Sequence, residues 1–418
     1  MSTGTLTRIQ ANQQPAWDAP ELLAPVLADL ESRPALVDPG SCKALRDELG
    51  RVLRGDALVL QAGECAELFA DSTTERVQAK AALLHRLGDC LAAGSGRPAI
   101  RVGRLAGQYA KPRSSPFEIL PDGRRLPSYR GEAVNSSAPD AAARRPDPRR
   151  MLRAYDASRA ALDVLDGYRP PLAAAVSSPG RHVPLYVSHE ALLLDYERAL
   201  VRSGGSGRRH ASSAHLLWVG DRTRQPNGAH IAFVRGIANP VAVKVGPSAS
   251  AADMAAIAGR LLPGHPDGGL ALIVRMGAAA VAGHLPSLVD ALSWRARRVL
   301  WICDPMHGNT RRTRGGHKTR VVADMLAEIR QTHQVLGQRG LRLSGLHLEV
   351  TPDPVTECLW SLDDFAASVH LPRYESPCDP RLNPAQALRV VQFTAGLISG
   401  DSEAGRPGLG CRSGGGAI

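Results

Sequence analysis

The stretch VAVKVGPSASAADMAAIAGRLLPGHPDGGLALIVRMG, residues 241–277, begins and ends with a short aliphatic run. Each run stops at a turn marked by glycine or a polar residue, and a helical pattern follows. The same rhythm recurs in the runs ALVLQ (57–61), AIRVG (99–103), HLLWVG (215–220), VLWICDP (299–305) and GLHLEV (345–350), with RYESPCD (373–379) as a weaker eighth candidate strand. Near-continuous apolar strands that alternate with helices predict an α/β fold with a parallel sheet covered on its faces. Eight repeats favour a closed (β/α)8 TIM barrel, with an open doubly wound sheet as the alternative.

The chain divides into three parts by composition. Residues 1–56 hold short apolar pieces broken by prolines and are interpreted as an N-terminal extension. Residues 57–400 form the barrel domain, and the clearest helix is expected at 320–337. Residues 401–418 are rich in glycine and are expected to form a flexible tail. Within the barrel, 111–150 is a long connection of the kind that is functional or disordered, and 203–214 is expected to be a flexible surface loop.

The net charge of +11 needs an explanation, because it results from 51 Lys plus Arg against 40 Asp plus Glu in 418 residues. Aromatic residues make up only 4% of the chain, and the arginine clusters at 144–150 and 311–314 lack interleaved rings, so we expect solvated loops there and no nucleic-acid binding. No apolar run approaches a membrane span and the polar start lacks a signal pattern, so we expect a soluble cytoplasmic protein without a membrane partner. Seven scattered cysteines predict reduced thiols.

Cationic side chains follow several of the predicted strands. In a barrel the working residues gather at the carboxyl ends of the strands. We therefore predict a ring of phosphate- and carboxylate-binding cations there, formed by Arg104, Lys111, Arg113, Arg222, Lys244 and Arg275. The alternative is that each cation pairs with a local carboxylate at the barrel mouth.

A second set of residues at the predicted strand ends consists of side chains that bind metals. Cys65, His307, Glu349 and Asp379 offer a thiolate, an imidazole and two carboxylates. Such a mixed set suits a divalent ion such as Mn²⁺, Co²⁺, Fe²⁺ or Zn²⁺. No short ligand spacing links the four residues, so the alternative for Cys65 is a small buried apolar residue.

These residues lie within segments that closely resemble the type II (plant-like) 3-deoxy-D-arabino-heptulosonate 7-phosphate (DAHP) synthases. The resemblance extends in order from residue 61 to residue 388. Its matching segments include QAGECAE (61–67), VGRLAGQYAKPRSSP (102–116), LPSYRGEAVN (126–135), HLLWVGDRTRQPNGAH (215–230), CDPMHGNT (303–310), GLHLEVTPDPVTEC (345–358) and CDPRLNPAQAL (378–388). The long segments GQYAKPRSS and CDPMHGNT are highly specific to the family.

The resemblance implies a barrel enzyme that condenses phosphoenolpyruvate with erythrose 4-phosphate and releases phosphate, at the first step of the shikimate pathway. It places a divalent metal, with Mn²⁺ or Co²⁺ favoured, on Cys65, His307, Glu349 and Asp379. Its phosphoenolpyruvate-binding positions are Arg104, Arg222, Lys244 and Arg275, with Asp221 beside them, and its erythrose-phosphate positions are Lys111, Arg113, Ser114 and Asn135. Lys111 is the candidate proton donor or hydrogen-bond donor to the aldehyde oxygen, and Glu349 or a metal-bound water is the candidate for the other proton.

The chain also departs from the family pattern. Asp221 stands where the family typically has Glu, and Asn227 stands where it has Asp. The segment 168–185 is short where longer members carry a helical pair linked to aromatic amino-acid inhibition, so we expect weak or no feedback and a possible role in secondary metabolism. An amino-DAHP synthase that uses an imino or amino sugar phosphate and a non-catalytic regulatory barrel remain open. We further expect a homo-oligomer, dimer or tetramer, and we hypothesise that Cys65 and Cys378 form a redox pair.

Overall fold

Eight parallel strands close into a barrel in the computed structural model, which describes residues 9–120, 123–169, 183–204, 207–368 and 370–404. In chain order the barrel strands are β1 (Leu58–Gly63), β2 (Ala99–Arg104), β5 (Leu185–Glu190), β8 (Leu216–Val219), β9 (Val241–Val245), β10 (Leu270–Val274), β11 (Leu300–Cys303) and β14 (Gly345–Glu349). Each strand pairs with the next one in this order, and β14 pairs with β1 to close the ring. The predicted (β/α)8 barrel is confirmed, and the open sheet is excluded.

One predicted strand is wrong. Residues 373–379 form a loop after β14, and the remaining barrel strand is β5, with the sequence LYVSHE. The loop segment contains Pro377, which cannot donate to a strand ladder, and it lacks a continuous apolar run. Strand β5 was not predicted because it lacks a continuous apolar run: Val187 is followed by Ser188, His189 and Glu190, which are polar yet buried. Asp379 therefore reaches the barrel mouth from a loop that follows β14.

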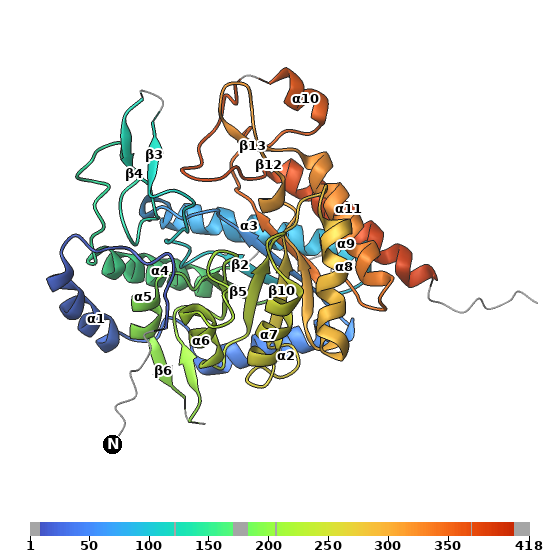
Figure 1. The fold of residues 1–418 in the computed structure, drawn as a ribbon, viewed down its shortest axis with the longest axis horizontal. Coiled ribbons are helices and arrows are strands. Elements are labelled where there is room, and N and C mark those ends of the chain that lie inside the picture. Colours follow the sequence, from blue (N-terminus) through green and yellow to red (C-terminus); the bar gives the residue numbers. More distant parts are fainter. Residues whose placement is uncertain (1–8, 121–122, 170–182, 205–206, 369, 405–418) are drawn as a thin grey trace, which may run out of the picture.

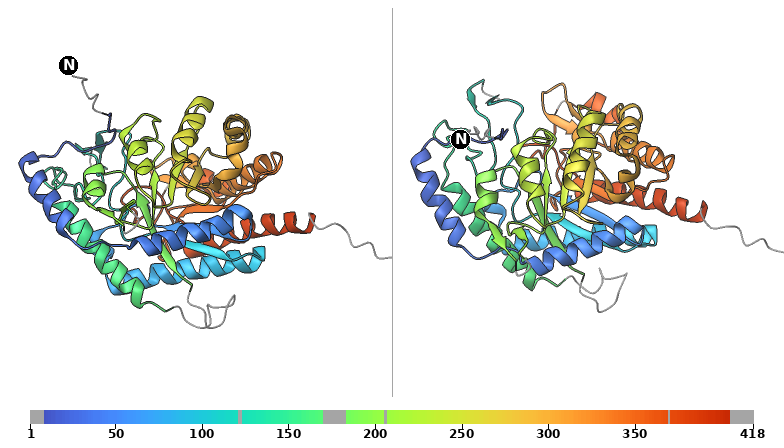
Figure 2. Two further views of the ribbon diagram at one scale, coloured as in Figure 1. Left: turned by 90° about the horizontal axis from the view of Figure 1, so that it is seen from below. Right: turned by 60° about the horizontal axis from the view of Figure 1, so that its bottom comes forward.

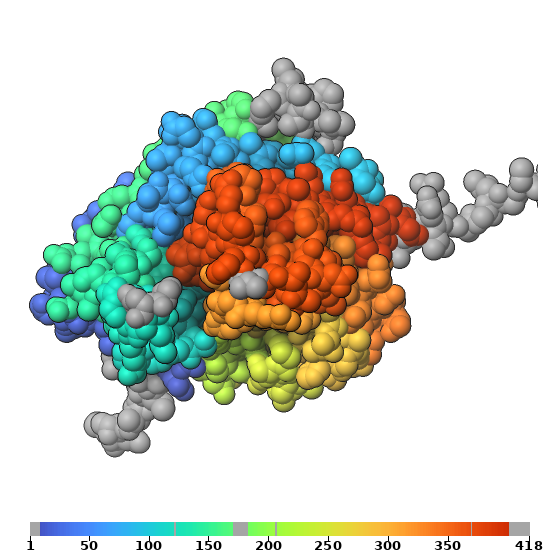
Figure 3. Space-filling model, turned by 90° about the horizontal axis from the view of Figure 1, so that it is seen from above, coloured from blue at the N-terminus to red at the C-terminus, as the bar shows by residue number. Residues whose placement is uncertain are grey.

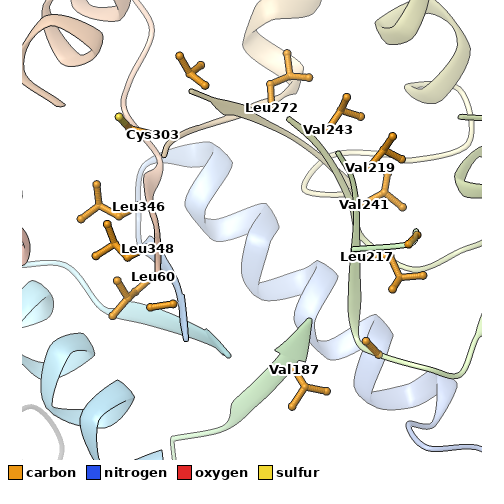
Figure 4. Close-up of a cluster of buried hydrophobic side chains, with 14 of the residues drawn as sticks. Leu60, Val187, Leu217, Val219, Val241, Val243, Leu272, Cys303, Leu346 and Leu348 are labelled. Atoms are coloured by element: carbon orange, nitrogen blue, oxygen red, sulfur yellow. The ribbon is translucent and has the colours of Figure 1, made fainter. Parts of the chain in front are cut away.

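Side chains alternate between the two faces of each barrel strand. The outward set includes Leu60, Val187, Leu217, Leu272 and Leu346, which point away from the barrel centre toward the surrounding helices (Figure 4). The inward set includes an apolar cluster in which Val59, Trp218, Ile273 and other residues lie with Leu45 and Leu49 of α2 (Pro39–Arg54). Helix α2 thus closes the bottom of the barrel (Figure 2), which leaves the carboxyl ends of the strands as the open end.

The helices that cover the barrel follow its strands. They are α3 (Thr74–Ser95), α4 (Arg150–Gly167), α5 (Leu194–Ala199), α6 (Ala229–Arg235), α7 (Ala251–Leu261), α8 (Val281–Leu292), α9 (Val322–Gly337) and α11 (Pro384–Ala404), and α11 packs beside α3 (Figure 2). The helix expected at 320–337 is confirmed as α9. None of the helices among the described residues is both long enough and apolar enough to cross a membrane.

Three hairpins interrupt the alternation. The pair β3 (Phe117–Ile119) and β4 (Arg125–Pro127) and the pair β12 (Thr310–Arg312) and β13 (Lys318–Arg320) stand at the same end of the barrel (Figure 1), near α10 (Leu362–Ala367). In the view onto this end, the β3–β4 region (teal) lies next to the segments that follow β11 and β14 (orange to red; Figure 3). The loop expected at 203–214 includes part of a third hairpin, β6 (Val201–Ser203) with β7 (Arg209–Ala211).

The N-terminal extension contains α1 (Leu23–Ser32) and α2, which pack on the barrel and its helices. At the other end, α11 continues four residues past the predicted domain boundary at 400. The rest of the predicted tail, 405–418, and most of the short connection at 168–185 lie outside the described residues.

Candidate active site and metal centre

A layer of buried polar side chains lies inside the barrel, above the apolar bottom layer. Gln61 donates to the Ser188 hydroxyl at 2.9 Å, and its Oε1 lies 2.8 Å from Nδ1 of His347. The guanidinium of Arg104 contacts Nε2 of His347 and lies over the Trp218 ring at 5.1 Å. Because these groups satisfy one another, the layer forms a rigid floor beneath the barrel mouth.

Glu349, the last residue of β14, lies at the centre of the mouth and is fully buried. Its Oε1 accepts from Nη2 of Arg104 at 2.9 Å, and its Oε2 accepts from Nη1 of Arg320 at 2.7 Å. Nε2 of His307 lies 3.1 Å from Oε1. Burial opposes ionisation, yet the surrounding cations, including Lys111 and Arg320, hold the pKa of Glu349 well below its usual range.

Three of the four predicted metal ligands converge at this point. Sγ of Cys65 and carboxylate oxygens of Glu349 and Asp379 lie within 4.8 Å of one another and form a possible metal-binding group. The fourth, His307, joins the edge of the group through its contact with Glu349. Nδ1 of His307 lies 2.7 Å from Oδ2 of Asp304, a second carboxylate that orients the ring so that Nε2 faces the group. Thiolate, imidazole and carboxylate donors in one place, with a carboxylate behind the imidazole, fit a divalent transition-metal ion.

Lys111 lies among these donors. Its Nζ is 2.7 Å from Oδ2 of Asp379 and 3.7 Å from Oε1 of Glu349, and it also contacts Sγ of Cys65. Burial by itself would lower the pKa of the ammonium group, but Asp379, Cys65 and Glu349 together raise it well above the usual value. Lys111 therefore carries a positive charge in direct contact with the candidate ligands.

Five of the six cations predicted to bind substrate have carboxylate partners in the structure. Arg104 pairs with Glu349, Lys111 with Asp379, Arg113 with Glu118, Lys244 with Asp304, and Arg275 with Asp221. The alternative of local pairing therefore holds for five of the six. Arg222 is exposed and has no ion pair with a described residue.

A hollow of about 510 Å³ opens beside this ring. Arg222, Arg113 and Ser114 line it, together with Gln13, Asp221, Arg224, Gln225, Pro226, Ser248 and Asp253. Arg275 connects the hollow to the metal-binding group, since it donates to Asp221 at 2.9 Å and to the backbone oxygen of His307 at 3.0 Å. The hollow and the metal-binding group are therefore linked through the guanidinium of Arg275.

Asn135 lies apart from the residues that line the hollow. Its side chain is fully buried, donates to the backbone oxygens of Ser128 and Arg144 at 3.0 and 3.1 Å, and accepts from the backbone N–H of Arg130 at 2.8 Å. The backbone oxygen of Arg130 in turn accepts from the N–H of Lys111 at 2.9 Å. In this structure Asn135 therefore holds the backbone that supports Lys111.

Three further charged residues at the barrel mouth were not predicted from the sequence. Arg320 is completely buried against Glu349, Lys318 donates to Asp379 at 2.8 Å, and Glu190 is a buried carboxyl surrounded by Lys244, Lys111 and Arg104. Burial raises the pKa of Glu190 despite these cations. The sequence does contain one indication of Lys318 and Arg320. They are two residues apart and follow a Gly-Gly turn, a spacing that places both side chains on one face of a hairpin strand.

The first of the two arginine clusters differs in part from the solvated loop that was expected. Arg144 is buried and pairs with Glu118 at 2.7 Å, and Arg150 pairs with Glu132 at 2.8 Å, so the first cluster is partly structural. Arg311 and Arg312 are exposed, as expected for the second cluster.

The side chains of Cys65 and Cys378 lie in one small buried cluster with Ala66 and Tyr129. Both are free cysteines in this structure. The contact makes the hypothesis of a redox pair geometrically reasonable, and it stays a prediction.

The chain is similar in sequence to known proteins over most of its length. The sequence model of the Class-II DAHP synthetase family matches residues 1–179 and 173–395. The chain is 39% identical to a phospho-2-dehydro-3-deoxyheptonate aldolase of Streptomyces coelicolor, over 93% of this chain and 95% of that one. It is 40% identical to a probable phospho-2-dehydro-3-deoxyheptonate aldolase of Pseudomonas fluorescens, over 92% and 94%. A truncated 3-deoxy-D-arabino-heptulosonate 7-phosphate synthase from Thermotoga maritima aligns in structure with a TM-score of 0.41 and 14% identity, over 82% and 87% of the two chains.

Proposed function

The chain belongs to the Class-II DAHP synthetase family, and from this membership we propose that it is a DAHP synthase, which joins phosphoenolpyruvate to erythrose 4-phosphate at the open end of its barrel. In this reaction C3 of the enol phosphate attacks the aldehyde carbon, water adds at C2, and the C2–O bond to phosphate breaks. The products are the seven-carbon keto acid phosphate and inorganic phosphate. The observation that carries the proposal is the position of Arg275, which joins the cationic hollow to the group formed by Cys65, Glu349 and Asp379.

The cations divide between the two substrates. Phosphoenolpyruvate carries a carboxylate and a phosphate, and we assign them to Arg104, Lys244, Arg275 and Arg222, next to Asp221. Arg222 is free to bind an anion without losing an ion partner, and Nε of Arg275 is buried without a hydrogen-bond partner among the described residues. A buried donor left unpaired is costly unless a ligand accepts from it, which favours an anion at this position. Arg113 and Ser114, in the wall of the hollow, suit the sugar phosphate.

The metal would be held by Cys65, His307, Glu349 and Asp379, with Mn²⁺ or Co²⁺ favoured and Fe²⁺ or Zn²⁺ also suited to this donor set. When bound, a divalent ion would supply Lewis-acid polarisation of a substrate carbonyl. Arg320 and Lys318 would hold the carboxylates of Glu349 and Asp379 in place.

Proton transfer falls to the chain's own groups. Lys111 carries its charge within reach of the metal-binding group, so we assign it the hydrogen bond and proton to the oxygen that develops charge when the aldehyde is attacked. Glu349 is the candidate for the second proton transfer. Asn135 supports Lys111 through the backbone of Arg130 and would act by positioning.

Regulation, metabolic role, location and assembly are inferred from the sequence alone. We propose weak or no inhibition by Phe, Trp or Tyr, a role that includes secondary metabolism, a cytoplasmic location and a dimeric or tetrameric assembly. An assay with millimolar aromatic amino acids tests the first point, and strong inhibition would contradict it.

The proposed activity is tested by phosphate release. The purified enzyme with a divalent metal should release phosphate only when phosphoenolpyruvate and erythrose 4-phosphate are both present. Lys244→Ala should reduce this release at least a hundredfold, because it removes a buried cation that faces the substrate. Release from phosphoenolpyruvate alone at the same rate would show a phosphatase instead.

A further inference from the structure

The first described residues of the chain form an N-terminal arm, residues 9–18, that runs over loops at the barrel mouth. The backbone oxygen of Gln10 accepts from the N–H of Ala229, at the start of α6, at 3.0 Å. The amide of Gln14 donates to the backbone oxygen of Leu192 at 2.8 Å and accepts from the N–H of Leu194 at 3.1 Å. These contacts join the arm to two separate βα connections of the barrel.

Gln13 makes different contacts, with the loop that carries the sugar-phosphate residues. Its Oε1 accepts from the backbone N–H of Arg113 at 2.9 Å, and its backbone oxygen accepts from the guanidinium of Arg130. Its φ is 62°, in the left-handed region that is unfavourable for a residue other than glycine. Unfavourable backbone conformations of this kind persist where surrounding contacts fix them, and they cluster at functional sites.

Gln13 also lines the cationic hollow beside Ser114 and Arg222. Its Nε2 amide has no hydrogen-bond partner among the residues that the structure describes, whereas Gln14 uses both atoms of its amide on the barrel. A neutral donor in a wall with three arginines, Arg113, Arg222 and Arg224, is well suited to a phosphate ester, since it adds a hydrogen bond without further charge repulsion.

From these contacts we infer that Gln13 of the N-terminal arm forms part of the wall of the substrate site and is a positioning residue for the sugar phosphate. Gln13 holds the backbone at Arg113 so that Arg113 and Ser114 face the hollow, and its Nε2 donates to the phosphate ester of the sugar. The inference rests on the proposed function, because it concerns the second substrate of that reaction. It assigns a binding role to a segment outside the barrel.

The test separates the two substrates. Gln13→Ala removes both the acceptor for Arg113 and the donor to the phosphate, so KM for erythrose 4-phosphate should rise about three- to tenfold or more, the range expected when one or two hydrogen bonds are lost. Gln13→Glu keeps the acceptor and adds a negative charge, so KM should rise further. KM for phosphoenolpyruvate should stay within twofold in both variants.

Two more variants distinguish the side chain from the arm as a whole. Gln14→Ala weakens the attachment of the arm on its other face, and it should also raise KM for erythrose 4-phosphate. Gln10→Ala is the matched control, because Gln10 contacts the barrel through its backbone oxygen and should leave both KM values unchanged. Thermal unfolding of each variant shows whether the fold is intact.

Calorimetric binding of erythrose 4-phosphate gives a reading that does not depend on turnover. Weaker binding in Gln13→Ala than in the unaltered enzyme would support the inference. Equal affinity, or an equal rise of both KM values, would overturn it while leaving the proposed function in place. An unaltered enzyme that binds the sugar phosphate but forms no product would contradict the proposed function alone.

Discussion

Nζ of Lys111 lies 2.7 Å from Oδ2 of Asp379, so the ammonium group and a candidate metal ligand are in direct contact at the barrel mouth. The two residues are 268 positions apart in sequence, on the loops that follow β2 and β14. Lys111 is placed by the N–H···O bond to Arg130, and Asp379 by the N–H bond of its own backbone to Sγ of Cys65 at 3.3 Å. The geometry makes Lys111 the group best placed to act on an oxygen that binds beside the metal ligands.

Replacing Lys111 tests this role. Lys111→Gln keeps a hydrogen-bond donor on a slightly shorter side chain but removes the charge, so we expect kcat to fall about a hundredfold or more, the range for a lost electrostatic or acid–base group. Lys111→Arg keeps the positive charge but carries it on a larger, planar group, so it should restore only part of the lost kcat. Steady-state kinetics measure the effect, and a kcat within tenfold of the unaltered enzyme for Lys111→Gln would show that another group serves the aldehyde oxygen.

The thiolate ligand predicts a spectroscopic signature. If Cys65 binds the metal, the enzyme loaded with Co²⁺ should show an intense sulfur-to-cobalt absorption band in the near ultraviolet. Cys65→Ser should lose this band, whereas Cys358→Ser should retain it, because Cys358 is buried and outside the group of converging ligands. Persistence of the band in Cys65→Ser would place the metal elsewhere.

Arg320 should act through Glu349. Its guanidinium is completely buried and donates to Oε2 of Glu349 and to the backbone oxygen of Pro380, next to Asp379. Nη1 donates both of these bonds, and Nε donates to the Thr310 hydroxyl at 3.2 Å. Arg320→Lys replaces this planar group by a single ammonium on a shorter side chain that cannot reproduce all three contacts, so metal affinity should fall about 10- to 100-fold, as for other residues that orient ligands. Arg312→Lys, on the exposed strand of the same hairpin, is the control. Equal metal affinity in both variants would contradict a positioning role.

Glu328 on α9 should make stability depend on pH. Its carboxylate accepts from the N–H groups of Met276 and Gly277 at 2.7 and 2.8 Å and from Asn309 at 2.7 Å, but burial raises its pKa from the usual 4.5 to about 8. Between these values the folded protein binds more protons than the unfolded chain, so the free energy of unfolding should decrease as pH rises from 4.5 to 8 and level off above 8.

The matched variant for this prediction is Glu328→Gln, which cannot ionise. Its free energy of unfolding should lose this component of the pH dependence, so that the difference between the two proteins changes by up to a few kcal/mol in favour of the variant between pH 5 and pH 8. Urea unfolding at a series of pH values measures it. Parallel curves for the two proteins would mean that Glu328 titrates with an ordinary pKa.

The strand–helix rhythm was sufficient to predict seven of the eight barrel strands, because each has an aliphatic run that is buried on both faces. Strand β5 was missed for a physical reason. Its inward side chains Ser188 and Glu190 lie in the polar layer of the barrel, so burial there does not produce an apolar sequence. The same polarity makes β5 part of the site.

The strand ends also predicted much of the site, since parallel strands bring their carboxyl ends together. Arg104, Lys244 and Glu349 converge for this reason. Arg320 and Gln13 were not predictable in this way, because a hairpin and an N-terminal arm bring them back to the mouth from outside the strand ends. Their positions depend on tertiary contacts that a sequence pattern does not encode.

The central claim is that this barrel joins phosphoenolpyruvate to erythrose 4-phosphate, and mass analysis of the organic product tests it most directly. The enzyme, supplied with a divalent metal, both substrates and, in a parallel reaction, the amino analogue of the sugar phosphate, should form DAHP from erythrose 4-phosphate, with one phosphate released per product molecule. A seven-carbon product formed only from the amino analogue, or no condensation product from either sugar, would contradict the claim.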